Sequence, residues 1–331
     1  MERFALAAAV VLGFALTAAL CSLFVPLRRV LERREQNQQP AQSEQPRPVP
    51  LRAPLWGGLC AAAGTVAAVG VGWLAACVGQ PELLGSEGRL MTRLLTALAG
   101  SLAFGAVGLA EDLARMRSPA ALGLRRDVRL LLEALAAAFV LLLLRAAGCL
   151  PRGLDVPGAG YVLLGSAVPF LWAVLMVVLA ECARIAERDE GTVCGAAFVA
   201  MLALMMAEAG LGVPGLAVLP AALAGALVAL LLWAFPPARL GVGCCGSLLA
   251  AGAIGCIPLS LDMTSLTVPL ALPFWAAGGL LAAQLLGAKR TGKPLRCWVK
   301  KHKMSPETVF LCSFALSAVG YVLALALLRW C

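Results

Sequence analysis

The feature that most constrains this chain is a succession of apolar runs, each about 20 residues long, separated by short polar loops. A helix of that length spans the hydrocarbon core of a membrane. We expect about ten such helices, near residues 4–27, 55–79, 91–110, 128–149, 159–180, 193–210, 216–235, 246–262, 267–288 and 307–328. The runs are too long for barrel strands and do not alternate as those do. The sequence therefore predicts an all-α polytopic membrane protein, with residues 1–331 forming one integral-membrane domain.

The composition excludes an ordinary soluble enzyme. Hydrophobic residues make up 61% of the chain and charged residues 14%, against roughly 45–50% and about 25% in typical globular proteins. So few polar side chains cannot cover so much apolar surface in water. The first apolar run is long for a cleaved signal peptide, so we interpret it as the first span.

The basic residues predict the orientation of the helices. The net charge of +9 would suggest nucleic-acid binding in a soluble protein, but here the positive-inside rule explains it better. Of the 27 Lys and Arg residues, 21 lie in five alternate loops, at 28–52, 111–129, 181–190, 236–245 and 289–303. We therefore expect five cytoplasmic loops, both termini outside and no nucleic-acid partner.

Two further features point away from a separate catalytic unit. Residues 35–50 are rich in Gln and Pro, which predicts a flexible part of the first cytoplasmic loop. The twelve cysteines show no CxxC spacing typical of zinc sites, and most lie in apolar runs, where a free thiol behaves as a small hydrophobe. Any chemistry is expected at the helix ends and in the cytoplasmic loops.

Acidic residues gather on the predicted cytoplasmic side, where ionisable groups beside a membrane are candidates for function. They form two groups: Glu111 with Asp112, and Glu181 with Glu187, Asp189 and Glu190. Two carboxylate clusters beside basic loops would suit a magnesium ion and the phosphates of a nucleotide. The alternative is that these are solvated loop carboxylates that offset nearby arginines.

Short motifs, in chain order, resemble those of a known family. They are Pro54-Leu55-Trp56-Gly57-Gly58, Gly105 to Leu113, Gly123-Leu124 with Arg129, residues 181–195, Gly246-Ser247-Leu248, Gln284 with Lys289 and Thr291-Gly292-Lys293, and Ser305 with Glu307. Their order, spacing and sidedness together resemble the phospho-N-acetylmuramoyl-pentapeptide transferases. These belong to the polyprenyl-phosphate hexosamine-phosphate transferases, of the glycosyltransferase family 4 type.

The resemblance implies a multi-pass protein of the bacterial plasma membrane that acts in peptidoglycan or cell-wall lipid-intermediate synthesis. Such a transferase moves a phospho-sugar from a UDP-linked nucleotide sugar to undecaprenyl phosphate, releases UMP and requires Mg²⁺. The implied partners are a polyprenyl phosphate lipid, a nucleotide sugar and the membrane, with a homodimer as a candidate assembly.

The resemblance also assigns roles to individual residues. The catalytic candidates are Asp112, Glu111 and Asp189; the metal candidates are Asp112, Glu187 and Glu190; and the substrate-binding candidates are Arg129, Lys293 and His302. Each basic candidate has an alternative. Arg129 would be a snorkelling interfacial arginine, and His302, as we favour, a surface histidine in a basic loop. The basic residues around Lys293 would face the anionic leaflet.

The departures from the family fall on its chemistry. Glu111, Glu187 and Glu190 replace Asp, Glu181 and Arg184 replace Asn, Arg188 replaces Gly, and the family's run of three His is missing apart from His302. By an alignment that needs one inserted residue, Cys244 replaces a metal-binding Asp, and a soft thiol is a poor Mg²⁺ ligand. The second hypothesis is thus a catalytically impaired paralogue that keeps the scaffold for lipid or partner binding. A transporter is disfavoured, because its charges should lie near the membrane midplane.

Overall fold

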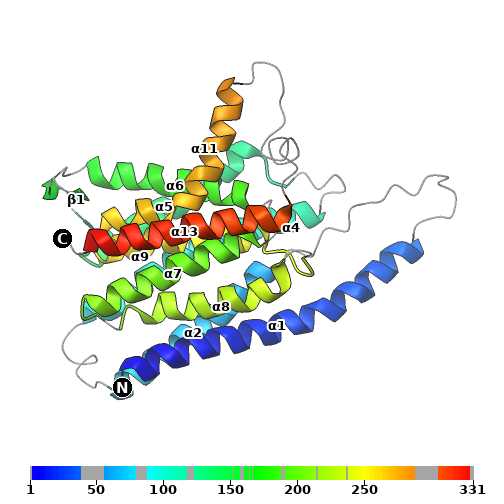
Figure 1. Cartoon of the computed structure of the whole chain (residues 1–331), viewed down its shortest axis with the longest axis horizontal. Coiled ribbons are helices and arrows are strands. Elements are labelled where there is room, and N and C mark those ends of the chain that lie inside the picture. The colour runs from blue at the N-terminus through cyan, green and yellow to red at the C-terminus, as the bar shows by residue number, and fades with distance from the viewer. Residues whose placement is uncertain are drawn as a thin grey trace.

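The protein is a bundle of helices (Figure 1). The computed structural model describes residues 2–38, 56–79, 88–117, 123–151, 153–156, 160–163, 165, 167–187, 191–213, 215–235, 238–287 and 305–328. Its helices are α1 (Glu2–Gln38), α2 (Gly57–Gly79), α4 (Gly88–Arg117), α5 (Arg126–Ala146), α6 (Ala167–Ala186), α7 (Thr192–Gly210), α8 (Val218–Ala234), α9 (Gly243–Ser260), α10 (Thr267–Leu270), α11 (Leu272–Gly287) and α13 (Pro306–Leu328). Helix α1 includes the first residues of the predicted flexible segment 35–50, and residues 39–50 lie outside the described residues.

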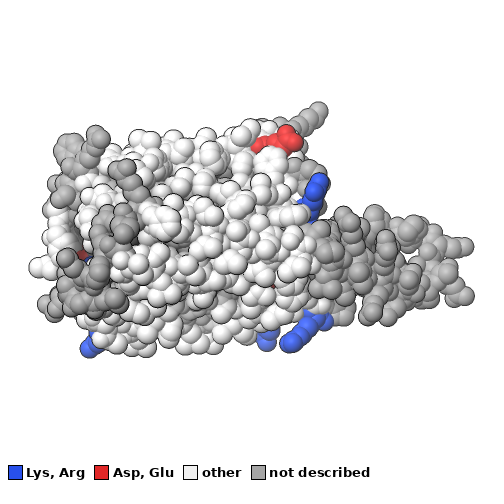
Figure 2. Space-filling view, turned by 90° about the horizontal axis from the view of Figure 1, so that it is seen from below, with Lys and Arg blue, Asp and Glu red and all other residues white. Residues whose placement is uncertain are grey.

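The prediction of an all-α membrane protein is confirmed. Within the described part of the chain, seven helical segments are long and apolar enough to cross a membrane: Phe4–Phe24, Gly57–Val78, Leu90–Arg117, Ala167–Ala186, Thr192–Gly210, Gly243–Ser260 and Pro306–Leu328. Helix α8 is apolar but has only 17 residues, so the count of ten spans stays a prediction. On the face shown in Figure 2, the charged side chains lie toward the two ends of the described part of the bundle, and the surface between them is uncharged.

The positions of the first and last described helices fit a chain that crosses the membrane an even number of times. In Figure 1 the first turn of α1 and the last turn of α13 lie at the same end, and the loop that leads into α9 lies at the opposite end. The cytoplasmic assignment of the second end still rests on the distribution of positive charge.

One predicted span begins at the wrong place. Residues 159–166 were expected to be helical, but strands β1 (Gly153–Val156) and β2 (Gly160–Leu163) form an antiparallel hairpin, and α6 begins only at Ala167. The apolar residues of β2 form a short run that begins at a glycine and contains Tyr and Val, which suits a strand as well as a helix. Their side chains are exposed.

Helix α9 is the centre of the bundle, because every one of its residues is buried. It packs against α2, α4, α6 and α7. Small residues allow this: a Cβ at Gly58 of α2 would collide with the backbone of Gly246, and a Cβ at Gly108 of α4 would collide with the carbonyl of Cys244. Such close approach is how helices associate in lipid. The glycines that resemble the family motifs therefore hold α9 in place.

The helices that surround α9 extend further toward the polar end than expected. Helix α4 continues to Arg117, beyond the predicted end at 110, and α6 continues to Ala186, beyond 180. Glu111, Asp112 and Glu181 are therefore helical residues rather than loop residues. This rigid setting fixes the directions of their side chains.

Candidate functional site

Asp112 joins the last turns of α4 to the first turn of α9. Its Oδ1 accepts the backbone N–H of Cys244 at 3.0 Å, and its Oδ2 accepts that of Cys245 at 2.9 Å. The first backbone N–H groups of a helix have no partner within it, and their partial positive charge favours an anion. Asp112 is 1% exposed, so this side chain serves as a buried cap supplied by another helix.

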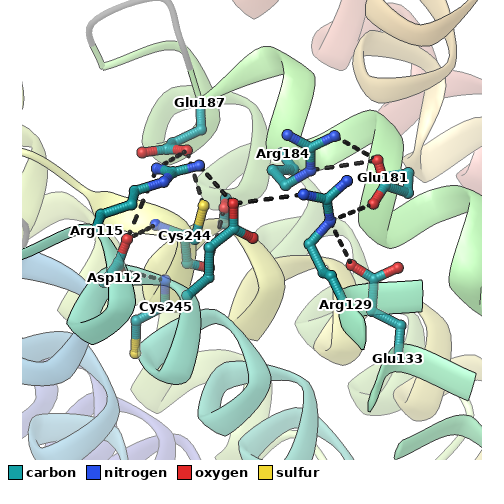
Figure 3. Close-up of polar contacts among 11 residues, drawn as sticks. Asp112, Arg115, Arg129, Glu133, Glu181, Arg184, Glu187, Cys244 and Cys245 are labelled. Atoms are coloured by element: carbon teal, nitrogen blue, oxygen red, sulfur yellow. Dashed lines mark hydrogen bonds and ion pairs between the residues drawn. The ribbon is translucent and has the colours of Figure 1, made fainter. Parts of the chain in front are cut away.

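Arg115 lies one turn further along α4 and faces three carboxylates (Figure 3). Its Nη2 donates to Glu111 Oε1 at 2.7 Å. Its Nη1 lies 3.8 Å from Asp112 Oδ1 and 3.7 Å from Glu187 Oε2. Since one nitrogen contacts both of these carboxylates, Asp112 and Glu187 are close enough to share a single cation.

Glu187 brings the end of α6 to the same place. The thiol of Cys244 donates to Glu187 Oε2 at 3.2 Å. Burial raises the pKa of the Glu187 carboxyl above its ordinary value, and the neighbouring Arg115 and the thiol of Cys244 partly offset that rise. The site therefore holds a carboxyl group that retains its proton more readily than an exposed one.

A second group of charges surrounds Arg129 at the start of α5. Its Nε donates to Glu181 Oε1 at 2.8 Å and lies 3.9 Å from Glu133 Oε1, and its Nη1 lies 3.6 Å from Glu111 Oε1. Arg184 also donates to Glu181, with Nε at 3.2 Å. Arg129 is buried, so the alternative of a snorkelling interfacial arginine is wrong.

Glu111 connects the two groups, because its Oε1 contacts both Arg115 and Arg129. The alternative of solvated loop carboxylates is wrong for Glu111 and Asp112, which are both buried. The other oxygen of Glu111 and both oxygens of Glu133 are buried without a hydrogen-bond partner in the described structure. A buried polar atom without a partner is unfavourable, so these oxygens are places where a ligand or water would be stabilised.

The described residues do not fit a divalent metal. The described part of the chain contains no group of three or more His, Cys, Asp or Glu able to hold a metal ion. At the position expected for a metal ligand stands Cys244, and its thiol donates to Glu187. Mg²⁺ requires near-octahedral oxygen ligands, whereas the space between Asp112 and Glu187 is taken by the guanidinium of Arg115.

The structure brings together four of the predicted site residues: Glu111, Asp112, Arg129 and Glu187. The others, Asp189, Glu190, Lys293 and His302, lie outside the described residues.

Sequence reasoning gave no site role to Arg115, Arg184 or Glu133. Arg115 stands three and four residues after Asp112 and Glu111, the spacing at which side chains meet on a helix. That signal was present in the sequence, but the predicted end of the helix at 110 concealed it.

Comparisons with known proteins agree on one family. A family model described as glycosyl transferase family 4 matches residues 94–262. The chain is 27% identical over 265 residues to a phospho-N-acetylmuramoyl-pentapeptide-transferase of Mycobacterium tuberculosis, covering 72% of each chain. It is 34% identical over 170 residues to the protein of that name from Desulforudis audaxviator, covering 48% of this chain and 50% of the relative. For the one from Synechococcus, the identity is 32% over 215 residues, with 63% and 55% covered.

Proposed function

Since the chain belongs to glycosyl transferase family 4, we propose that it transfers a phospho-sugar from a UDP-linked donor to undecaprenyl phosphate. The observation that carries the proposal is the convergence of Glu111, Asp112, Arg129 and Glu187 at one end of the bundle. These residues come from α4, α5 and the end of α6, and α9 closes the cluster. A lipid substrate suits this location, because its apolar chain can lie along the membrane-facing surface of the helices.

The cluster contains the groups that such a transfer needs. Donor and acceptor phosphates repel each other, and positioned guanidinium groups offset that repulsion and bind phosphate oxygens through two parallel hydrogen bonds. Arg129 would exchange carboxylate partners for phosphate oxygens when substrates bind. Asp112 and Glu111 are the candidates for acidic groups beside the reacting phosphates, and Asp189 keeps that role only as a prediction.

The family implies a divalent metal, which would neutralise phosphate charge when bound. The described residues do not fit the ion, so the proposed roles of the side chains do not depend on it. The metal roles of Asp112, Glu187 and Glu190 therefore remain predictions, as do the substrate contacts of Lys293 and His302.

The test is an assay of the purified full chain in detergent with labelled UDP-MurNAc-pentapeptide and undecaprenyl phosphate. We expect release of UMP and formation of a labelled lipid, and we expect Asp112→Asn to abolish both. Arg117→Gln is the matched control, because Arg117 is an exposed residue of the same helix. No UMP release by folded wild-type protein with this donor or with UDP-N-acetylglucosamine would contradict the proposal.

A second candidate function is binding of a polyprenyl phosphate without transfer. It is favoured by one observation: Arg115, Arg129 and Arg184 are all ion-paired with carboxylates of the chain itself. A site whose guanidinium groups already have carboxylate partners can persist without its reaction. Retained binding of undecaprenyl phosphate with no UMP release would favour this candidate over the first.

A further inference from the structure

The carboxylates at the ends of α4 and α6 need a positive charge, and the chain supplies one. Asp112 is 1% exposed, Glu111 is 2% exposed, and Glu187 is largely buried beside them. Buried carboxylates close together repel one another and are costly unless a cation lies among them. The group that provides this cation therefore helps to assemble this end of the bundle, whether or not transfer occurs.

Arg115 has the geometry of that cation. Its guanidinium contacts Glu111 at 2.7 Å, Glu187 at 3.7 Å and Asp112 at 3.8 Å, from two different nitrogens. The planar guanidinium stays charged under all physiological conditions and presents several donors at once. It thereby offsets part of the negative charge of the three carboxylates, a role that a metal ion could otherwise fill.

The neighbours of Arg115 agree with this role. Both Asp112 oxygens accept backbone N–H groups of α9, so this carboxylate is held in place without a metal. Cys244 contributes a thiol that donates to Glu187 rather than an oxygen that binds a hard cation. The longer reach of Glu111, one methylene more than Asp, brings its Oε1 to the guanidinium of the residue four positions later.

We propose that Arg115 is the resident cation of this site and that Arg115 and Cys244 together replace a divalent metal in its assembly. Arg115 is a positioning residue: it holds Glu111, Asp112 and Glu187 in one arrangement. The proposal concerns the assembly of the site and does not depend on turnover.

The test measures Mn²⁺ binding and thermal unfolding of the full chain in detergent, with Mn²⁺ alone as the probe. For the wild type we expect no Mn²⁺ bound through the cluster and the same melting temperature in Mg²⁺ as in EDTA. The double variant Arg115→Gln with Cys244→Asp should bind Mn²⁺ at least about tenfold more tightly than the wild type and should melt higher in Mg²⁺ than in EDTA. Arg115→Lys should retain metal independence, and Arg117→Gln is the control for loss of one charge on α4.

Two outcomes would overturn the proposal: wild-type binding of Mn²⁺ that Asp112→Asn or Glu187→Gln removes, or a double variant that folds but gains no Mn²⁺ binding. If the wild type binds Mn²⁺ and neither single variant changes that binding, the ion is bound outside the cluster. This outcome supports the proposal. If the double variant does not fold, the single variant Cys244→Asp decides: continued metal independence supports the proposal, and new Mn²⁺ dependence of its melting temperature overturns it. Because these readouts need no turnover, an absence of UMP release would count against the proposed function alone.

Discussion

Two adjoining regions of this protein differ in how they relate to its family. The first, which we call the packing seam, is formed by Gly58 of α2, Gly108 of α4 and the first turns of α9. Its sequence resembles the family motifs, and its glycines are required by close contact between backbones. The second is the charge cluster around Arg115 and Arg129, which contains several of the residues expected to depart from the family motifs. The seam is held by close backbone contacts, and the cluster is held by ion pairs between side chains.

The largest effect is expected when the charge cluster loses Arg129. Arg129→Gln removes the one described ion-pair partner of Glu133, while Glu111 keeps Arg115 and Glu181 keeps Arg184; breaking a buried ion pair in this way costs about 3–5 kcal/mol. Unfolding of the purified protein in detergent measures it. Arg125→Gln is the control, because Arg125 and its partner Asp127 are both highly exposed, so its effect should be close to zero. Equal stability of the two variants would show that the cluster is not a structural unit.

The packing seam should be almost as sensitive. Gly58→Ala forces a Cβ into the backbone of Gly246, and overpacking of this kind costs about 1–3 kcal/mol. Gly70→Ala in the same helix meets nothing within 4 Å and should change stability by less than about 1 kcal/mol. Melting temperatures of the two variants make the comparison, and a Gly58→Ala protein as stable as Gly70→Ala would mean that α2 and α9 do not touch there.

The boundary between the two regions runs through Cys244, whose backbone belongs to the seam and whose thiol belongs to the cluster. Cys244→Ser keeps a donor for Glu187 and should be nearly neutral. Cys244→Ala removes the donor and should cost about 1 kcal/mol, the usual value of one hydrogen bond. If the alanine variant is as stable as the serine variant, the thiol makes no useful contact with Glu187.

The smallest expected effect is a pH dependence carried by Glu187. Burial raises its pKa above the ordinary 4.5, so the folded state binds its proton more tightly than the unfolded state. That contribution to stability is present below pH 4.5 and is lost as the pH rises through the folded-state pKa. The charged and titratable groups that act on it include Arg115, Glu111, Asp112, Arg184 and Cys244.

Glu187→Gln removes this contribution and is the matched variant. The melting temperature of the wild type minus that of Glu187→Gln should therefore decrease as the pH rises from 4.5 toward neutrality. A difference that stays constant with pH, or shifts the other way, would contradict the assignment.

The sequence predicts the seam better than the cluster, for physical reasons. Runs of apolar residues determine where helices cross a membrane, and the motif glycines mark where α2, α4 and α9 approach one another. The strand Gly160–Leu163 was predicted as helix because a four-residue apolar run has no distinctive period.

The charge cluster depends on tertiary contacts that no local pattern contains. The pair of Arg129 with Glu181 joins residues 52 positions apart, and the hydrogen bonds of Asp112 to α9 join residues 132 and 133 apart. Glu111, Asp112, Glu181 and Glu187 were correctly predicted to gather at one end, but their partners were not. Arg115 was counted as a determinant of orientation, and its contacts appear only once α4 is known to continue to Arg117.

The most direct test of Arg115 as the resident cation is a crystal structure of the full chain soaked with Mn²⁺, with an anomalous difference map at the ends of α4 and α9. We expect the Arg115 guanidinium to lie among Glu111, Asp112 and Glu187, with no anomalous peak between these carboxylates. A Mn²⁺ peak bound by Asp112 and Glu187, with Arg115 displaced, would contradict it.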